Sequence, residues 1–470
     1  MSAGRPLVAA PAGPILGFAS DGVRRFLGVP YAEAPIGPLR FAEPQPRAVF
    51  EPVFDASRHC ATPQRVALFE TTTIPEPSIA GDDTLNLDLF APEQADRAPV
   101  LFWIHGGGYI AGSHASPWYD GSAFAREGVV TVNASYRLGL DGFGIVPGAP
   151  DNRGLRDLIA ALRWVRDNIA AFGGDPGRVT IAGQSAGGGA VLSLLASPPA
   201  QGLFQRAVSI SGVDRSIDAD DAARLTERVA ERLGVPATAD GFGPRDDGSA
   251  TRLLIAFRDE DEEGTIMQFG PVAGDDVLPE PVPLGLRTIG TGVPLLAGST
   301  ADEFDGGPTP ENPDQPGPDD PDVIAAKETG TRITDILFRS TCVRVARARA
   351  GASAGTWLYS FDWPSPVMQG ATHCIDVPFL LGTLDSVGVP AALGDAIPAA
   401  LGSAAHGDLL SFVRGEVPAW RTAAGETGDA VRSYGPDGVA RVVAGSYDAC
   451  VRAADLPAGN PENLGDGAVD

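Results

Sequence analysis

The chain has 470 residues, of which 43% are hydrophobic and 20% are charged, and its formal net charge at pH 7 is −25. These values are typical of a globular protein with a large buried core. Such an acidic surface repels phosphate groups, which argues against a nucleic-acid-binding protein and against attachment to an anionic membrane.

The four cysteines are far apart and lack the spacing of metal ligands, so we expect neither a metal site nor a disulfide scaffold. No apolar run is long enough to span a membrane. The segment 1–18 contains one arginine and is interrupted by Pro11 and Pro14, which is untypical of a signal peptide. We expect a cytoplasmic protein, although the sequence does not exclude secretion.

Apolar, β-branched runs alternate along the chain with stretches whose apolar residues recur at helical spacing. Strands that alternate with helices indicate an α/β fold, with a mostly parallel sheet flanked by helices. In chain order we expect strands at 100–104 and 129–133, a helix at 155–171, a strand at 178–182, a helix at 188–196, and strands at 207–210, 293–298 and 356–361.

Two stretches interrupt this alternation. Residues 215–265 are rich in Asp, Arg and Glu and have a helical pattern, whereas 305–325 are dense in Pro, Asp and Gly and are typical of a surface loop. We expect a single domain over 1–470 with cap-like insertions at about 215–265 and 305–355. The polar tail from Leu456 onward is expected to be frayed.

Residues 183–187 read Gly-Gln-Ser-Ala-Gly and lie between an expected strand and an expected helix. A bare G-x-S-x-G pattern is often only a tight turn. Between a strand and a helix, however, it is typical of a nucleophile elbow, in which a strained turn exposes the serine hydroxyl above the sheet. We therefore predict that Ser185 is a nucleophile.

A serine nucleophile needs a general base, normally histidine, and the base needs an acid that orients it. In hydrolases with such an elbow the order along the chain is serine, acid, histidine. Of five histidines, only His373 and His406 come late enough. His373 follows the strand expected at 356–361, whereas His406 has the pattern of a surface residue at a helix start, so we favour His373.

The acid is expected just after a strand, and the strand at 293–298 is followed by three carboxylates. By position, Asp302, Glu303 and Asp305 are all candidates, and each is equally compatible with a solvated loop residue. Their positions alone leave the choice among them open.

Residues 105–109 read His-Gly-Gly-Gly-Tyr and follow the strand expected at 100–104. Consecutive glycines let backbone N–H groups approach the negatively charged oxygen that develops during ester cleavage. A phosphate-binding loop is disfavoured because no Gly-Lys-Ser/Thr follows. The amide of Ala186 would be a further donor.

Several separate segments together match one known family. They are Phe26-Leu27-Gly28-Val29-Pro30-Tyr31-Ala32, Trp103-Ile104-His105-Gly106-Gly107-Gly108, Tyr136-Arg137-Leu138-Gly139 and the run from Asn168 to Gly188. The chain thereby resembles the type-B carboxylesterase family, which includes bacterial para-nitrobenzyl esterases and the cholinesterases. The resemblance implies an α/β-hydrolase fold, a small-molecule ester substrate, and neither a metal nor an organic cofactor.

The resemblance also implies roles for single residues. It places the acid at Glu303 and the base at His373, and it makes the amides of Gly107, Gly108 and Ala186 the oxyanion donors. It further places Ser211 and Gln184 around the triad.

This sequence departs from the family pattern close to the acid and the base. Phe304 and Cys374 stand where the pattern has glycine, and Asp376 stands where it has glutamate. A disulfide of the family would join Cys60 to the position of Thr84, so that bridge cannot form here.

We expect a serine carboxylesterase that works through an acyl-enzyme intermediate, as a monomer or small homo-oligomer. Three alternatives stay open. The same triad serves amide, carbamate or lactone hydrolysis, and it also serves acyl transfer. The third is a non-catalytic binding protein of the same fold, which the retained serine, acid and histidine disfavour.

Overall fold

The structure is a computed structural model. It describes residues 5–63, 66, 72–245, 248–260, 269–304, 321–423 and 430–455, without the side chains of 258–260 and 321–326.

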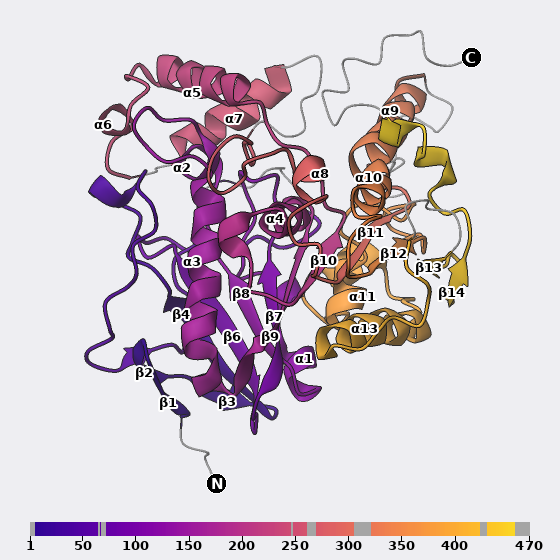
Figure 1. The fold of residues 1–470 in the computed structure, drawn as a ribbon, viewed down its shortest axis with the longest axis horizontal. Coiled ribbons are helices and arrows are strands. Elements are labelled where there is room, and N and C mark those ends of the chain that lie inside the picture. Colours follow the sequence, from indigo (N-terminus) through magenta and orange to yellow (C-terminus); the bar gives the residue numbers. More distant parts are fainter. Residues whose placement is uncertain are drawn as a thin grey trace.

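An eleven-stranded sheet runs through the centre of the molecule (Figure 1). Its strands lie in the order β14-β13-β12-β11-β10-β9-β7-β8-β6-β4-β3, parallel from β13 to β8 and antiparallel at both ends. The predicted α/β fold with a mostly parallel sheet is therefore confirmed, and each expected strand falls on an observed one. The bounds are β3 Phe18–Ser20, β4 Val23–Pro30, β6 Asn86–Pro92, β7 Ala98–Ile104, β8 Val130–Ala134, β9 Gly174–Gln184, β10 Arg206–Ile210, β11 Leu295–Thr300, β12 Thr356–Phe361, β13 Val431–Tyr434 and β14 Ala440–Val443.

A smaller three-stranded sheet joins β1 (Leu7–Ala10), β2 (Gly13–Leu16) and β5 (Phe54–Asp55). The helices are α1 Ser122–Arg126, α2 Gly139–Phe143, α3 Arg153–Asn168, α4 Ala186–Leu195, α5 Ala219–Leu233, α6 Ala239–Phe242, α7 Ser249–Glu260, α8 Val282–Gly285, α9 Pro321–Ile333, α10 Ser340–Ala348, α11 Val377–Leu381, α12 Val389–Leu393 and α13 Ala399–Arg414.

Helices cover both faces of the central sheet, and strand β7 explains why. Every residue of β7 is buried. Because successive side chains of a strand point to opposite faces, Phe102 and Ile104 belong to the core on one face and Leu101 and Trp103 to the core on the other. In Figure 1, α3 (purple) belongs to the first core and α13 (orange) to the second.

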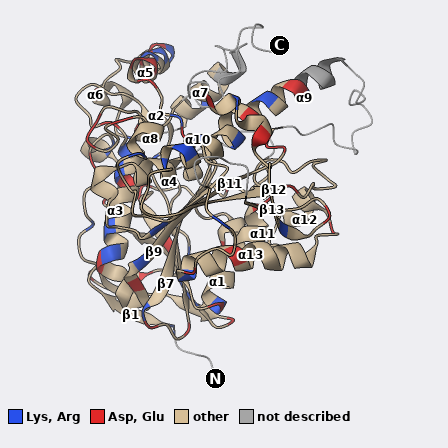
Figure 2. Cartoon of the chain, turned by 45° about the vertical axis from the view of Figure 1, so that its right-hand side comes forward, with Lys and Arg blue, Asp and Glu red and all other residues tan. Residues whose placement is uncertain are grey.

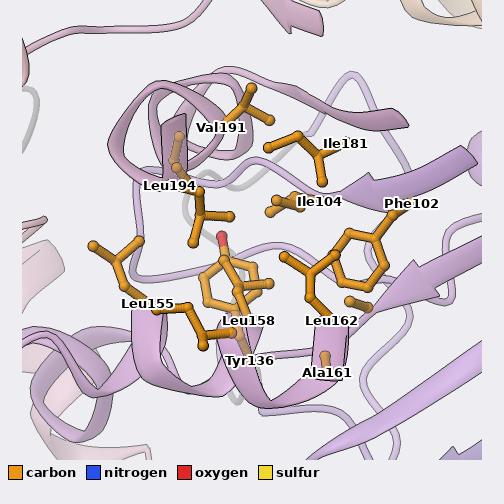
Figure 3. Close-up of a cluster of buried hydrophobic side chains, with 14 of the residues drawn as sticks. Phe102, Ile104, Tyr136, Leu155, Leu158, Ala161, Leu162, Ile181, Val191 and Leu194 are labelled. Carbon is orange, nitrogen blue, oxygen red and sulfur yellow. The ribbon is translucent and has the colours of Figure 1, made fainter. Parts of the chain in front are cut away.

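Figure 3 shows the first core at the level of α3. Leu158 and Leu162, four residues apart on the helix, point at Phe102 of β7 and Ile181 of β9, and Val191 of α4 closes the cluster. This apolar stripe at helical spacing is the pattern that predicted the helix. It fixes α3 and α4 against the strands that end at the candidate site.

The two interrupting stretches differ from each other. Residues 215–265 form α5, α6 and α7 as far as Glu260, in agreement with the helical pattern, and 261–265 lie outside the described residues. The loop expected at 305–325 is wrong at its end, because α9 begins at Pro321. Proline is favoured in the first turn of a helix, so the last proline of the stretch starts a helix instead of continuing a loop. Residues 305–320 and the tail from Leu456 lie outside the described residues.

The expectation that His406 marks a helix start on the surface is wrong. Helix α13 begins at Ala399, so His406 lies in the middle of it and is half-buried. Its ring packs edge-on against Phe124, and its Nδ1 lies 3.0 Å from the carbonyl oxygen of Leu380. The small residues before His406 continue the helix, which the sequence pattern missed.

Figure 2 shows Lys and Arg in blue and Asp and Glu in red on the outer helices α3, α5 and α9. Within the described ranges, none of the helices combines the length and the apolar character needed to cross a bilayer.

Candidate active site

Ser185 occupies a sharp turn between β9, which ends at Gln184, and α4, which begins at Ala186. Its backbone has φ 58° and ψ −125°, a strained conformation for a residue with a side chain. The turn is held from both sides, because the Ser185 N–H donates to the Ile210 carbonyl at 2.9 Å and its own carbonyl accepts from the Gly189 N–H at 2.9 Å.

The turn also requires a glycine at the second position after the serine, which is Gly187. A Cβ atom on Gly187 would lie 2.1 Å from the carbonyl oxygen of Ile104 on β7. The elbow can therefore approach β7 only without a side chain at that position, which is the physical content of the predicted motif.

The glycine-rich loop after β7 lies beside the elbow. Gly107 has φ 115° and Gly108 has φ 61°, both in the left-handed range. The carbonyl of Gly107 accepts from the N–H groups of Ile110 and Ala111 at 3.1 and 2.9 Å, which fixes the turn. In the described part of the chain, the N–H groups of Gly107 and Gly108 donate to no backbone acceptor. Ala186 is the first residue of α4, whose N–H has no partner within the helix.

Glu303 and His373 come from two adjacent parallel strands. Glu303 follows β11 and His373 follows β12, and Thr300 pairs with Phe361 where both strands end. The Nδ1–H of His373 donates to Oε2 of Glu303, while Oε1 accepts from the Thr300 N–H at 2.9 Å. The Glu303 side chain is fully buried and the His373 side chain is 19% exposed.

The two other candidate acids do not face the imidazole in this way. The Asp302 carboxylate accepts from the Ala371 N–H at 2.8 Å, and its own N–H donates to the Ala371 carbonyl at 3.0 Å. Asp302 therefore joins the loops after β11 and β12. Asp305 lies outside the described residues.

Electrostatics favours a protonated His373. Burial of the ring opposes its protonation, but the neighbouring Cys374 and Glu303 more than offset this and hold the pKa of His373 well above 6.5. A strong base is what abstraction of a proton from a serine hydroxyl requires.

Ser185, Gly107, Ala186 and His373 all line one cavity of about 540 Å³. Its lining includes the apolar side chains of Phe304, Leu337, Phe338 and Met368 and the polar side chains of Thr72, Ser113 and Tyr119. A groove of about 550 Å³ near α3 contains none of the candidate residues, so we place the site in the first cavity. Among the described residues, no group of three or more His, Cys, Asp and Glu side chains could hold a metal ion.

Gln184 lies at the imidazole, whereas Ser211 lies beside the elbow. The side-chain nitrogen of Gln184 lies 3.1 Å from Nε2 of His373 and donates to Sγ of Cys374 at 3.2 Å. Ser211 is buried directly after β10, next to the Ile210 carbonyl that anchors the elbow, with φ 46°. Its hydroxyl has no hydrogen-bond partner in the described part of the chain.

Asp376, three residues after His373, carries a second buried carboxyl group. Asp376 is fully buried and accepts from the Tyr359 hydroxyl at 3.0 Å. Burial, together with the nearby Glu303, raises the pKa of Asp376 from 3.8 to about 7. The sequence showed an unusual residue here, but nothing in it indicated this burial.

Phe338 is a residue that the sequence reasoning missed entirely. It lies 3% exposed in a π-helical segment, Thr334–Arg339, and contacts the imidazole of His373. No local sequence pattern marks a π-helix, so nothing in the sequence indicated this contact.

Comparisons with known proteins show the family of the chain. The profile of the carboxylesterase family matches residues 4–320. The chain is 35% identical to the para-nitrobenzyl esterase of Bacillus subtilis (strain 168) over 410 residues, which cover 80% of this chain and 82% of that protein. It is 32% identical to the phenmedipham hydrolase of Pseudarthrobacter oxydans, in an alignment that covers 89% of this chain and 93% of the relative.

Solved structures of esterases have the same fold. A PNB esterase superposes with a TM-score of 0.83 at 28% identity, covering 96% of this chain and 100% of the other. The carboxylesterase EST55 of Geobacillus stearothermophilus superposes with a TM-score of 0.80 at 29% identity and the same coverage. The fold is thus that of an α/β-hydrolase, and the chain belongs to the carboxylesterase family of carboxylic ester hydrolases.

Proposed function

We propose that Ser185, His373 and Glu303 are the catalytic triad of this esterase. The observation that carries the proposal is a single cavity lined by the strained Ser185, by the imidazole bonded to a buried carboxylate, and by the glycine-rich loop. A strained serine, an oriented base and free backbone donors in one cavity are the components of acyl transfer.

In the first half of the reaction, the Ser185 hydroxyl oxygen attacks the ester carbonyl carbon while its proton passes to Nε2 of His373. Glu303 accepts a hydrogen bond from the Nδ1–H of His373 and stabilises the imidazolium. The amides of Gly107, Gly108 and Ala186 donate to the oxyanion of the tetrahedral intermediate. The alcohol then leaves with the proton from Nε2, and the acyl group stays on Ser185.

In the second half, water attacks the acyl-enzyme and gives its proton to Nε2, and the acid leaves as Ser185 regains its hydrogen.

The side-chain amide nitrogen of Gln184 lies close to Nε2 of His373. We expect this side chain to turn away when substrate enters, so that Nε2 is free to accept a proton.

The same reasoning extends to the domain and its partners. We propose one domain over 1–470 with a cap formed by about 215–265 and 305–355, since Ile333, Leu337 and Phe338 from the second segment line the cavity. We further propose a cytoplasmic monomer or small homo-oligomer that binds small-molecule esters and no nucleic acid. The four unpaired cysteines and the net charge of −25 support this.

The test is hydrolysis of a panel of esters by the variant Ser185→Ala. The panel varies acyl length and alcohol size, and it includes a para-nitrobenzyl ester because of the substrate named for the Bacillus relative. We expect kcat to fall by roughly 10⁴-fold or more with an unchanged thermal melt.

Ser193→Ala is the matched control. Its hydroxyl bonds to the Gly189 carbonyl within α4, so this variant removes a nearby serine outside the cavity. Robust activity in Ser185→Ala, or an equal loss in the control, would overturn the assignment.

A further inference from the structure

Two phenylalanine rings pack against the imidazole of His373. The Phe304 ring stacks on it at 5.3 Å between centroids with 29° between the planes, and the Phe338 ring lies at 5.0 Å and 55°. The two phenyl rings stack on each other at 5.5 Å and 25°. These three side chains, which we call the imidazole cluster, all line the cavity that contains Ser185.

Hydrogen bonds between side chains and backbone hold the cluster together. The N–H of Phe304 donates to Oγ1 of Thr334 at 3.1 Å, at the first residue of the π-helical segment that carries Phe338. At the end of that segment, Arg339 donates to the Thr300 carbonyl at 3.2 Å. The loop of Glu303 is thus joined to both ends of the segment, and π-helical turns are frequent at functional sites.

The rings act differently on the two protonation states of His373. An aromatic face attracts a cation within about 6 Å and has little preference for a neutral ring. Both phenyl centroids lie within this distance of the imidazole. In the proposed reaction His373 is charged while the tetrahedral intermediate exists, so the attraction is strongest where the barrier is highest.

We propose that Phe304 and Phe338 are positioning residues that orient His373 and stabilise its imidazolium form. The proposal rests on the role of His373 as the base. It also gives a physical reason for Phe304, which stands where the family pattern has glycine.

The test compares Phe304→Leu and Phe338→Leu with the unchanged enzyme. Leucine keeps apolar bulk over the imidazole and removes the aromatic face. We expect each change to lower kcat about five-fold, to change KM less than about two-fold, and to move the acid limb of kcat/KM about half a pH unit lower. Phe304→Tyr keeps an aromatic face, so kcat and the acid limb of this variant should match those of the unchanged enzyme.

Phe54→Leu is the matched control, because Phe54 stacks on Phe50 at 4.8 Å, lies in β5 of the three-stranded sheet and does not line the cavity. We expect it to leave kcat and the acid limb unchanged.

A panel of p-nitrophenyl acetate, butyrate and octanoate separates orientation of the base from the shape of the cavity. The same factor for all three esters supports the proposal. A factor that depends on acyl length, or an unmoved acid limb, overturns it, because the rings then act only as a wall. Failure of the triad itself would appear instead as activity in Ser185→Ala.

Discussion

Replacing Asp376 by asparagine removes a carboxyl group that the fold keeps away from water. The side chain is fully buried, Oδ2 accepts from the Tyr359 hydroxyl, and Oδ1 has no partner among the described residues. An ionised carboxylate in such a place is costly, and the pKa of Asp376 accordingly rises from 3.8 to about 7 through burial and the nearby Glu303.

The sign of the effect on stability follows from proton binding. Between pH 3.8 and about 7 the folded protein keeps a proton on Asp376 that the unfolded chain has lost. The contribution of this group to the free energy of unfolding therefore falls as the pH rises through that window, and it is constant above it. About three pH units at about 1.4 kcal/mol each amount to about 4 kcal/mol.

Asparagine carries no titrating proton, so Asp376→Asn removes this loss. Relative to the unchanged protein, the variant should gain roughly 3 kcal/mol of unfolding free energy between pH 5 and pH 8. Urea unfolding followed by tryptophan fluorescence at both pH values measures the difference.

The exposed Asp385 provides the control, since Asp385→Asn should change stability by less than about 0.5 kcal/mol at either pH. If the stability difference for Asp376→Asn is the same at pH 5 and pH 8, Asp376 does not titrate between them and the reasoning about its burial is refuted.

Three other changes test the triad and the glycine loop by ester hydrolysis. Glu303→Gln should lower kcat by about 10³-fold or more, because a neutral amide no longer stabilises the imidazolium. Asp302→Asn keeps an acceptor for the Ala371 N–H and should lower kcat less than about ten-fold. Equal losses of kcat in the two variants would contradict the choice of acid. Gly107→Ala should lower kcat by at least about 10²-fold and reduce thermal stability, because the new Cβ would lie 2.2 Å from the Ala111 carbonyl oxygen and would displace the loop that carries the backbone donors. Normal activity in this variant would contradict the role of the loop. Activity should fall as the pH decreases through the raised pKa of His373, because the base must be neutral to accept a proton. The acid limb of kcat/KM should therefore lie above pH 6.5 and move to lower pH in Glu303→Gln. An acid limb below pH 6.5 in the unchanged enzyme would be inconsistent with the pairing of His373 and Glu303.

Much of the fold could be predicted because it depends on local patterns. The run at 100–104 is apolar throughout and became a strand buried on both faces, and the stripe containing Leu158 and Leu162 became the packed face of α3. His406 shows the limit of such patterns. The residues before it have no strong periodicity, and only the full length of α13 shows that it is not at a helix start.

For the site, the sequence by itself determined the strand–serine–helix motif and the glycine loop, because each depends on residues that are neighbours in the chain. The chain order of serine, acid and histidine also limited the base to His373 or His406. The family resemblance already indicated Glu303 as the acid, but only the tertiary structure shows that Glu303 rather than Asp302 contacts His373, since this depends on β11 and β12 lying side by side. Only the tertiary structure likewise brought Phe338 to His373 and buried Asp376. Contacts between distant segments and the loss of water around a carboxylate arise from packing, and no local sequence pattern encodes them.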